Sequence, residues 1–306
     1  MNYENFPRLP SQCAYSECQS KSTSLTPGHF VRKGFYFRSS DGRSIPRFSC
    51  LVCKRSFSSA SFSNCFGQKK RRLNDQIFKL LVSGVSQRRA AKILGTTRGT
   101  VVRKFLFLAV RARASHQTFL KEFIEKRGKL NEVVFDEMES FEKSKCLPVS
   151  IPLAVDPKTR KVLGFGVCSM PAKGPLAKIS VQKYGPREDH RTPTALSLWK
   201  SMRSCLVESP TVISDENPRY PKWIHHYFPK ATHVTHKGRK GCVVGQGELK
   251  RGGFDPLFAL NHTAAMFRAN INRLFRRTWC TTKHLERLAD HIAIYVRFHN
   301  EILTDQ

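Results

Sequence analysis

The chain has 306 residues, of which 40% are hydrophobic, enough for two or three domains with apolar cores. Its 53 Lys and Arg residues against 23 Asp and Glu residues give a net charge of +30, which favours a polyanionic partner such as nucleic acid over an acidic small substrate. The sequence has neither an apolar run of ~18 residues nor the pattern of a signal peptide. It therefore predicts neither a membrane span nor export, and we expect a cytoplasmic protein.

The excess positive charge is concentrated at the front of the chain. Residues 1–72, 73–130 and 131–306 each carry a net charge of +10, although the third stretch is much the longest. The first 130 residues therefore hold two thirds of the excess, and acidic side chains appear mainly after position 131. We infer a front part that binds nucleic acid and a rear part that performs chemistry.

Four cysteines near the N-terminus form two closely spaced pairs. In a reducing compartment such pairs indicate metal ligands more than disulfides, and two pairs on a small β framework can surround Zn²⁺ tetrahedrally. Strand-like runs cover 29–37 and 46–48, and residues 11–60 hold few aliphatic side chains, so a structural zinc would be needed to stabilise the fold. Four reduced thiols without metal are the alternative; His29 could replace one thiol, and Cys65 is surplus. The four predicted ligands are Cys13, Cys18, Cys50 and Cys53.

Residues 73–114 change to helical periodicity. Apolar residues within 77–81 predict a first helix, Ser86 is a candidate cap for a second helix that ends at Gly95, and a third helix is expected from about Thr97. This spacing is typical of a helix-turn-helix, whose last helix enters the DNA major groove. The alternative is an ordinary three-helix bundle with a solvated charged face.

The candidate DNA contacts lie in a basic run before this segment and at the start of its third helix. Lysine and arginine neutralise phosphate charge, and short polar side chains reach bases and phosphates. The candidates are Lys69, Lys70, Arg71, Arg72, Thr97, Arg98, Thr100, Arg103 and Lys104.

After Gly128 the apolar pattern becomes that of β-strands joined by short turns. The order of the expected elements is βββαβαβα, which predicts a mixed α/β sheet. In a ribonuclease H-like sheet of this order, the first and fourth strands are neighbours. The expected strands cover 131–141, 149–155, 161–168, 211–214 and 232–235, and the expected helices cover 194–207, 222–228 and a long stretch after Pro256.

Two carboxylates that are far apart in the sequence fall on these neighbouring strands. Asp136 lies within the first strand, and Asp215 follows the fourth. An Asp within an apolar strand is costly to bury unless it is paired or binds a cation, and carboxylates are the ligands that hold the Mg²⁺ or Mn²⁺ ions of phosphodiester cleavage. A solvent-facing Asp136 is the alternative. Glu137 and Glu139 are rivals, because a shift of one residue in register exchanges the two faces.

Four short segments occur in the order found in one family of enzymes. They are residues 46–58, 135–141, 212–215 with 218–220, and 260–262 with 270–283. The first, with the helical segment that follows it, resembles the zinc-ribbon and DNA-binding start of bacterial insertion-element transposases. The second and third resemble the strand and the turn that carry the first two catalytic Asp residues of these enzymes. The fourth is similar to the third-ligand helix of the insertion sequence one group and its relatives.

This resemblance implies a three-domain DNA transposase. A small zinc ribbon would cover 1–66, an all-α helix-turn-helix domain 67–128, and an α/β ribonuclease H-like catalytic domain 129–306. The protein would bind the terminal inverted repeats of an insertion element, cleave a strand and join it to target double-stranded DNA. We expect a homodimer or a larger oligomer on DNA, associated with the bacterial nucleoid. A catalytically inactive DNA-binding regulator and a structure-selective nuclease of the same fold are the alternatives.

The resemblance also implies the catalytic ligands. Asp136, Asp215 and Asn261 would hold two Mg²⁺ or Mn²⁺ ions per active site, although the family most often has Glu at the third position. An amide oxygen contributes no charge, so binding would be weaker than with a carboxylate. Glu248, Asp255 and His262 are alternatives for the third ligand, and Asn261 could instead cap a helix. Further candidate DNA contacts are Arg268, Arg273, Arg276 and Arg277.

Overall fold

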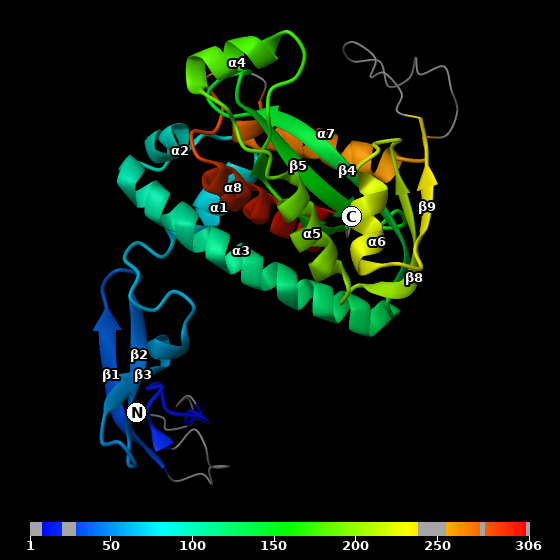
Figure 1. Ribbon diagram of the computed structural model, residues 1–306. Helices are drawn as coiled ribbons and strands as arrows, with labels where there is room; N and C mark the ends of the chain where they lie inside the picture. The colour runs from blue at the N-terminus through cyan, green and yellow to red at the C-terminus, as the bar shows by residue number, and fades with distance from the viewer. Residues whose placement is uncertain (1–7, 20–28, 238–254, 276–278, 304–306) are drawn as a thin grey trace. The chain divides into compact units, whose positions relative to one another are not determined.

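The computed structural model describes residues 8–19, 29–237, 255–275 and 279–303. Glu248, Arg276 and Arg277, which the sequence singled out, lie outside these described residues. The chain divides into two compact units, residues 1–74 and 75–306. Figure 1 shows the first unit in blue and the second in cyan to red.

The first unit is built on an antiparallel sheet in the order β1-β2-β3. Its core contains Phe30, Phe48 and Phe57, whose rings meet at centroid distances of 5.8 and 5.9 Å, together with three buried cysteines. So small an apolar cluster provides little burial for the unit. The elements are β1 (Phe30–Arg38), β2 (Arg43–Cys50), β3 (Ser56–Ser58) and the short helix η3 (Ser59–Phe62).

Three helices follow. Ser86 caps the second, as the sequence predicted, and Thr97, which the sequence offered as a DNA contact, caps the third. The Ser86 hydroxyl accepts from the Arg89 amide at 3.3 Å, and the Thr97 hydroxyl accepts from the Thr100 amide at 3.3 Å. These bonds satisfy amides that a helix start leaves unpaired. The helices are α1 (Leu73–Val82), α2 (Gln87–Ile93) and α3 (Arg98–Arg127).

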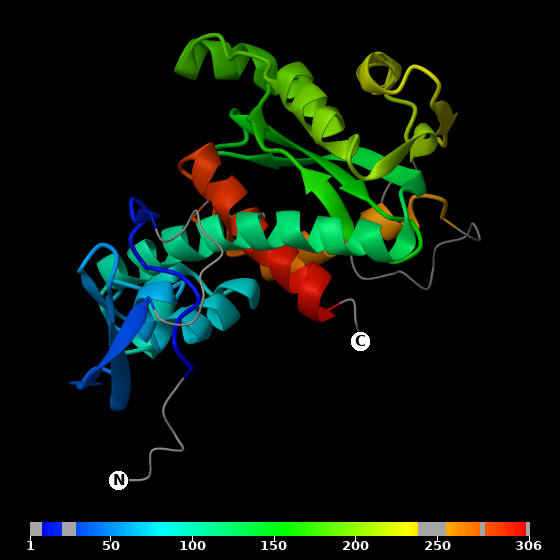
Figure 2. The same ribbon diagram turned by 90° about the horizontal axis from the view of Figure 1, so that it is seen from below.

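α3 is longer than the sequence periodicity suggested. Its first part packs within the helical segment, and its last part packs beside the sheet. Near its start, Phe105 packs edge-on against His291 of α8 (Leu285–Phe298) at 5.8 Å, and Arg113 pairs with Asp290 at 2.7 Å. Near its end, Phe123 enters the core beside the sheet. Figure 2 shows α3 in contact with α8. The helical segment after residue 74 and the sheet therefore form one compact unit.

The second unit contains the predicted mixed sheet, with strand order β6-β5-β4-β8-β9 and β7 paired to β5. β4 is antiparallel to β5 and parallel to β8, and β8 is parallel to β9. The first and fourth predicted strands, β4 and β8, are therefore neighbours. The strands are β4 (Leu130–Phe141), β5 (Pro148–Val155), β6 (Val162–Phe165), β7 (Cys168–Ser169), β8 (Leu206–Ser214) and β9 (Thr232–Thr235).

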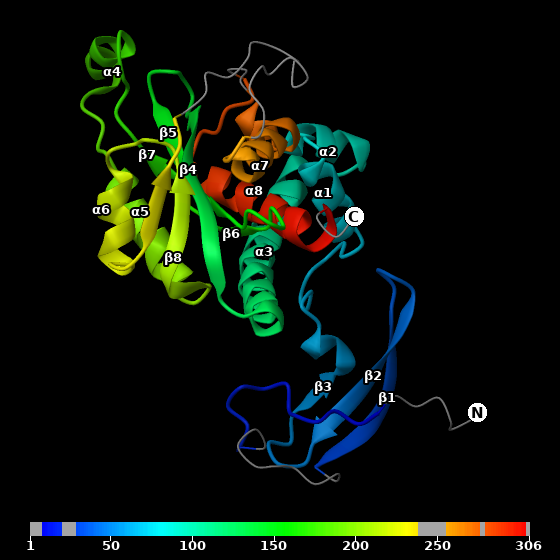
Figure 3. The ribbon, with the colours of Figure 1, turned by 90° about the vertical axis from the view of Figure 1, so that its right-hand side faces the viewer.

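Helices cover both faces of this sheet: Figure 3 shows α5 and α6 on one side and α7 and α8 on the other. The helix α4 lies between β7 and α5, where the sequence predicted no helix. The expectation of one long helix after Pro256 was wrong: this stretch forms two helices, because the backbone becomes extended at Ile271. No helix among the described residues is long and apolar enough to cross a membrane. The remaining helices are α4 (Leu176–Tyr184), α5 (Arg191–Met202), α6 (Tyr220–Tyr227), α7 (Phe258–Asn270), η5 (Asn272–Leu274) and η6 (His299–Leu303).

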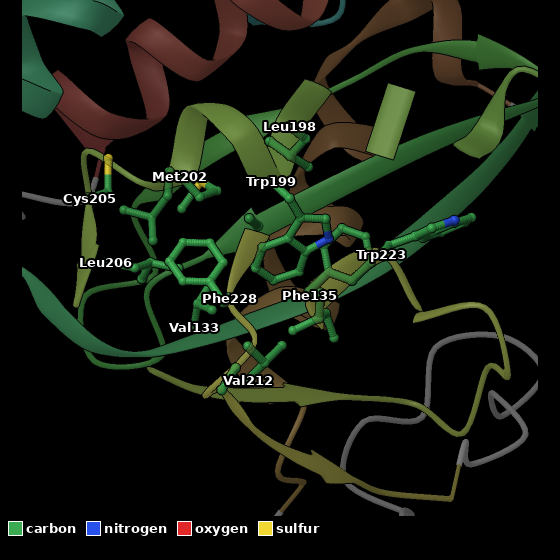
Figure 4. Close-up of a cluster of buried hydrophobic side chains, with 14 of the residues drawn as sticks. Val133, Phe135, Leu198, Trp199, Met202, Cys205, Leu206, Val212, Trp223 and Phe228 are labelled. Atoms are coloured by element: carbon green, nitrogen blue, oxygen red, sulfur yellow. The ribbon is translucent and has the colours of Figure 1, made fainter. Parts of the chain in front are cut away.

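An aromatic core joins β4 to α5 and α6 (Figure 4). The Phe135 ring lies 5.1 Å from that of Trp199 and 4.9 Å from that of Tyr220, and all three side chains are buried. Burial of each such ring contributes about 1.5–3 kcal/mol. This core fixes the start of α6 against the strand that carries Asp136.

Candidate active site and metal centre

The four predicted cysteines come together in the first unit. The sulfurs of Cys13 and Cys53 are 3.7 Å apart, those of Cys18 and Cys50 are 3.8 Å apart, and all four lie within 4.8 Å of one another. Four thiolates at about 2.3 Å from a tetrahedral Zn²⁺ would be about 3.8 Å apart. The cluster therefore has the size and chemistry to hold zinc.

The protonation of this cluster also fits a metal site. Burial raises the pKa of the Cys13 thiol to about 12, because the other thiols offer no positive charge to stabilise its thiolate. A divalent cation would replace these protons and release them on binding. Neither His29 nor Cys65 belongs to the cluster. The Cys65 sulfur instead accepts from the Asn74 side chain at 3.3 Å.

In the second unit, the predicted carboxylate Asp136 lies on β4, and the second, Asp215, directly follows the neighbouring parallel strand β8. Val134 of β4 stands opposite Ile213 of β8, and this register, continued by two residues, would set Asp136 level with Asp215. Adjacent strands are about 4.8 Å apart. The negative charge of Asp215 acts on Asp136, which fits this arrangement of two residues that are 79 positions apart in the sequence.

Asp136 is half-buried and held by two donors. The Tyr220 hydroxyl donates to its Oδ1 at 2.8 Å, and the Glu137 amide donates to the same oxygen at 2.6 Å. Burial, followed by the negative charge of Asp215, raises the pKa of Asp136 to about 6. A cation placed between the two carboxylates would offset both effects, so the pair suits Mg²⁺ or Mn²⁺.

The two rival glutamates on β4 have partners of their own. Side chains alternate along a strand, which places Glu137 and Glu139 on the face opposite to Asp136. Glu137 accepts a short hydrogen bond from the Ser150 hydroxyl, and burial raises its pKa. Glu139 pairs with Lys173 at 2.7 Å.

The candidates for the third ligand are arranged around the start of α7. The Asn261 amide donates to Asp255 at 3.0 Å, and Asp255 also accepts from the Leu257 amide. His262 is half-buried against the Phe258 ring, at 5.6 Å. The cysteine cluster is the one set of three or more His, Cys, Asp or Glu side chains in the described ranges whose ligand atoms all lie within 4.8 Å. Neither Asp255 nor His262 therefore completes a preformed trio with Asp136 and Asp215.

The predicted DNA contacts at the start of α3 differ in their exposure to solvent. Thr97, Arg98 and Arg103 are exposed, and Thr100 shares a hydrogen bond of 3.1 Å with Thr97. Lys104 is only 6% exposed, because it lies on the helix side that packs into the unit. Lys104 is therefore poorly placed to bind a phosphate.

The other predicted DNA contacts also differ in exposure and in the bonds they make. Arg71 is half-buried and donates to the Gln68 carbonyl at 3.2 Å, whereas Lys69, Lys70 and Arg72 are exposed.

In the second unit, Arg273 stacks over the Phe105 ring at 5.7 Å, and burial lowers its pKa. Arg273 is thus committed to packing between α3 and the segment after α7. Arg268 lines a recess of about 320 Å³ together with Met138, Glu139, Ser140, Phe141, Lys145, Pro148 and Leu274.

Sequence reasoning missed an ion-pair network beside Asp215. Arg191, which is 7% exposed, makes two bonds to Asp189 at 2.6 and 2.8 Å, and Arg219 makes a third at 3.1 Å. The bonds from Arg191 are the main reason why the pKa of Asp189 lies well below its usual range. Because Arg219 stands in the turn between Asp215 and Tyr220, the network anchors that turn. Asp189 and Arg219 are 30 residues apart in the sequence, and no rule of local spacing links them.

Comparison with known proteins identifies no family. No family model matches the chain, and no curated protein does. Among solved structures, the chain is similar to one described as the crystal structure of the Mos1 strand transfer complex. The alignment has 11% sequence identity, covers 76% of each chain and has a TM-score of 0.28. A TM-score this low does not establish a common fold.

Proposed function

We propose that this chain is a DNA transposase whose active site is built on Asp136 and Asp215 of a ribonuclease H-like sheet. The observation that supports the proposal most is the parallel pairing of β4 with β8, whose register, continued by two residues, would bring these two carboxylates side by side. The raised pKa of Asp136, caused by burial and by the charge of Asp215, supports the proposal that this site binds a cation.

In this proposal Asp136 and Asp215 hold divalent ions, and Asn261 of α7 supplies the third ligand after turning from Asp255. Bound Mg²⁺ or Mn²⁺ would polarise the scissile phosphodiester and favour ionisation of the attacking water. The water oxygen bonds to phosphorus as the bond to the 3′-oxygen breaks, which leaves a 3′-hydroxyl. That hydroxyl then attacks a phosphodiester of the target, joining the strands and releasing the target's own 3′-oxygen.

The front of the chain would bind the element ends, with the helical segment acting as a helix-turn-helix. The charge excess of the first 130 residues supports this role, and so do exposed Arg98 and Arg103 at the start of α3. A zinc ribbon held by the four cysteines would add a second DNA-binding element. Pairing of two element ends would require at least a dimer.

One observation favours a second candidate, a DNA-binding regulator without catalysis. Asn261 and Asp255 are hydrogen-bonded to each other, so the side chain proposed as the third ligand has another partner in this structure. A protein of this kind would need the positive front part and no divalent ion in the second unit.

Strand cleavage separates these candidates. The full-length protein is incubated with Mg²⁺ or Mn²⁺ and duplex DNA carrying the repeats that flank its coding sequence. We expect Asp136→Ala and Asp215→Ala to lower the cleavage rate on the order of 10³-fold, because the ions contribute several kcal/mol to the transition state. Glu208→Ala, which removes an exposed carboxylate from β8, is the matched control and should cleave normally.

Three other results would redirect the assignment. Equal rates in all four proteins would exclude this active site. Binding of the repeats without cleavage by the wild type would favour the regulator. Cleavage of branched DNA, without dependence on the repeats and without strand joining, would favour a structure-selective nuclease.

A further inference from the structure

Tyr220 reaches the proposed active site from the turn that also carries Asp215. It is the first residue of α6, five positions after Asp215, and its side chain is 0% exposed. Its hydroxyl donates to Asp136 Oδ1 at 2.8 Å and accepts from the Glu137 amide at 3.1 Å. One hydroxyl thus ties the turn after β8 to the middle of β4.

The two oxygens of Asp136 are in different situations. Oδ1 receives hydrogen bonds from the Tyr220 hydroxyl and from the Glu137 amide. Within the described part of the chain, no hydrogen bond reaches Oδ2. Since a carboxylate oxygen has two lone pairs, both of those on Oδ1 are engaged and those on Oδ2 are available.

The Tyr220 hydroxyl is fixed in position by the packing of its ring. The Tyr220 ring packs against Phe135 at 4.9 Å and Trp223 at 5.6 Å, which prevents it from swinging away. The packed ring therefore holds the hydroxyl within hydrogen-bonding distance of Asp136.

We propose that Tyr220 is a positioning residue of the metal site, whose hydroxyl holds Oδ1 of Asp136 so that Oδ2 is the oxygen presented to the divalent ion. This inference rests on the proposed function, because it takes Asp136 as a ligand. It adds to that function which oxygen of Asp136 binds the ion and which group orients the carboxylate. Partners that orient a ligating side chain typically change metal affinity by 10–100-fold.

The test is direct binding of Mn²⁺ to the full-length protein, measured by calorimetry after the cysteine cluster has been loaded with Zn²⁺. Tyr220→Phe keeps the ring and its packing and removes only the hydroxyl. The matched control is Tyr295→Phe on α8, which removes another buried hydroxyl, one that accepts from Asn270 at 3.1 Å. We expect Tyr220→Phe to weaken Mn²⁺ binding about 10-fold and Tyr295→Phe to leave it unchanged.

Cleavage provides a second readout that a purely structural role would not alter. Tyr220→Phe should raise the Mn²⁺ concentration for half-maximal cleavage about 10-fold while leaving the rate at saturating Mn²⁺ much less affected. Equal Mn²⁺ affinity in wild type and Tyr220→Phe would overturn the inference. An equal loss of affinity in Tyr220→Phe and Tyr295→Phe would overturn it as well, since the effect would then be general.

Asp136→Ala distinguishes failure of this inference from failure of the proposed function. If Asp136→Ala binds Mn²⁺ as the wild type does, the active-site assignment itself is wrong. If Asp136→Ala loses Mn²⁺ binding and Tyr220→Phe does not, the active-site assignment stands and the positioning role of Tyr220 is excluded. Should Tyr220→Phe not fold, the wild type labelled with 3-fluorotyrosine replaces it. Mn²⁺ should then broaden a tyrosine ¹⁹F resonance in the wild type and not in Asp136→Ala, and the absence of broadening would overturn the inference.

Discussion

The two compact units of this chain bury apolar cores of very different size. In the first unit, the buried core is three phenylalanines and three cysteines, and strand β1 leaves Phe37 70% exposed. In the second unit, Trp199, Trp223 and many aliphatic side chains are fully enclosed around the sheet. Zinc in the first unit would therefore be part of the fold, whereas divalent ions in the second would serve chemistry alone.

The largest expected effect is loss of zinc from the first unit. Cys50→Ser should abolish binding of one Zn²⁺ and unfold residues 1–74, because structural zinc contributes on the order of 10 kcal/mol. The thermal transition of the second unit should stay where it is. Cys65→Ser, which alters a cysteine outside the cluster, is the control and should retain both zinc and fold. Zinc content by mass spectrometry and limited proteolysis provide the measurements, and a protease-resistant first unit in zinc-free Cys50→Ser would contradict this account.

Acid should weaken the second unit through His291. This side chain is fully buried, its Nε2 lies 3.1 Å from the Leu81 carbonyl, and desolvation lowers its pKa to about 4. Between pH 6.5 and 4 the unfolded chain binds the proton and the folded chain does not, so stability falls as the pH drops. The loss attributable to His291 reaches about 3 kcal/mol at pH 4.

Urea unfolding of the second unit at pH 7 and pH 4.5 measures this effect. His291→Gln retains a donor but cannot be protonated, so it should flatten the dependence on pH. His190→Gln, at an exposed histidine, should leave the dependence unchanged. Identical slopes for the wild type and His291→Gln would remove His291 as the cause.

A smaller effect is expected from the ion pairs beside Asp215. Asp189→Asn weakens the bonds from Arg191 and Arg219, which should lower stability by about 1–2 kcal/mol and slow DNA cleavage several-fold by loosening the turn. Asp41→Asn is a matched control in the first unit, because Asp41 also makes two bonds to one arginine, Arg38. Asp41→Asn should leave cleavage unchanged, and a similar slowing in both variants would show that the effect does not arise at the turn.

Much of the scaffold could be predicted from local pattern. Ser86 and Thr97 stand where a capping hydroxyl is needed, and both cap their helices. Alternation and the order of apolar runs predicted the strands and the pairing of β4 with β8. Two cysteine pairs with short spacings predicted the cluster, since each pair is local and only one long-range contact is needed to join them.

The rest depends on contacts that no local pattern encodes. Lys104 was counted among basic contacts, but its helix side is set by packing against the rest of the unit. The bond from Tyr220 to Asp136 spans 84 positions, and Asp189 meets Arg219 only because α5 and α6 lie side by side. The choice between Asn261 and Asp255 rests on side-chain rotation, which the sequence does not restrict.

The most direct test of the central claim is to locate the divalent ion. Fe²⁺ would replace Mg²⁺ in the full-length protein, and peroxide with ascorbate would then cleave the polypeptide beside the bound ion. Cuts near Asp136 and near Asp215 together are expected in the wild type, and neither cut is expected in Asp136→Ala. Cuts confined to other segments, or a pattern unchanged in Asp136→Ala, would contradict a metal site at these two strands.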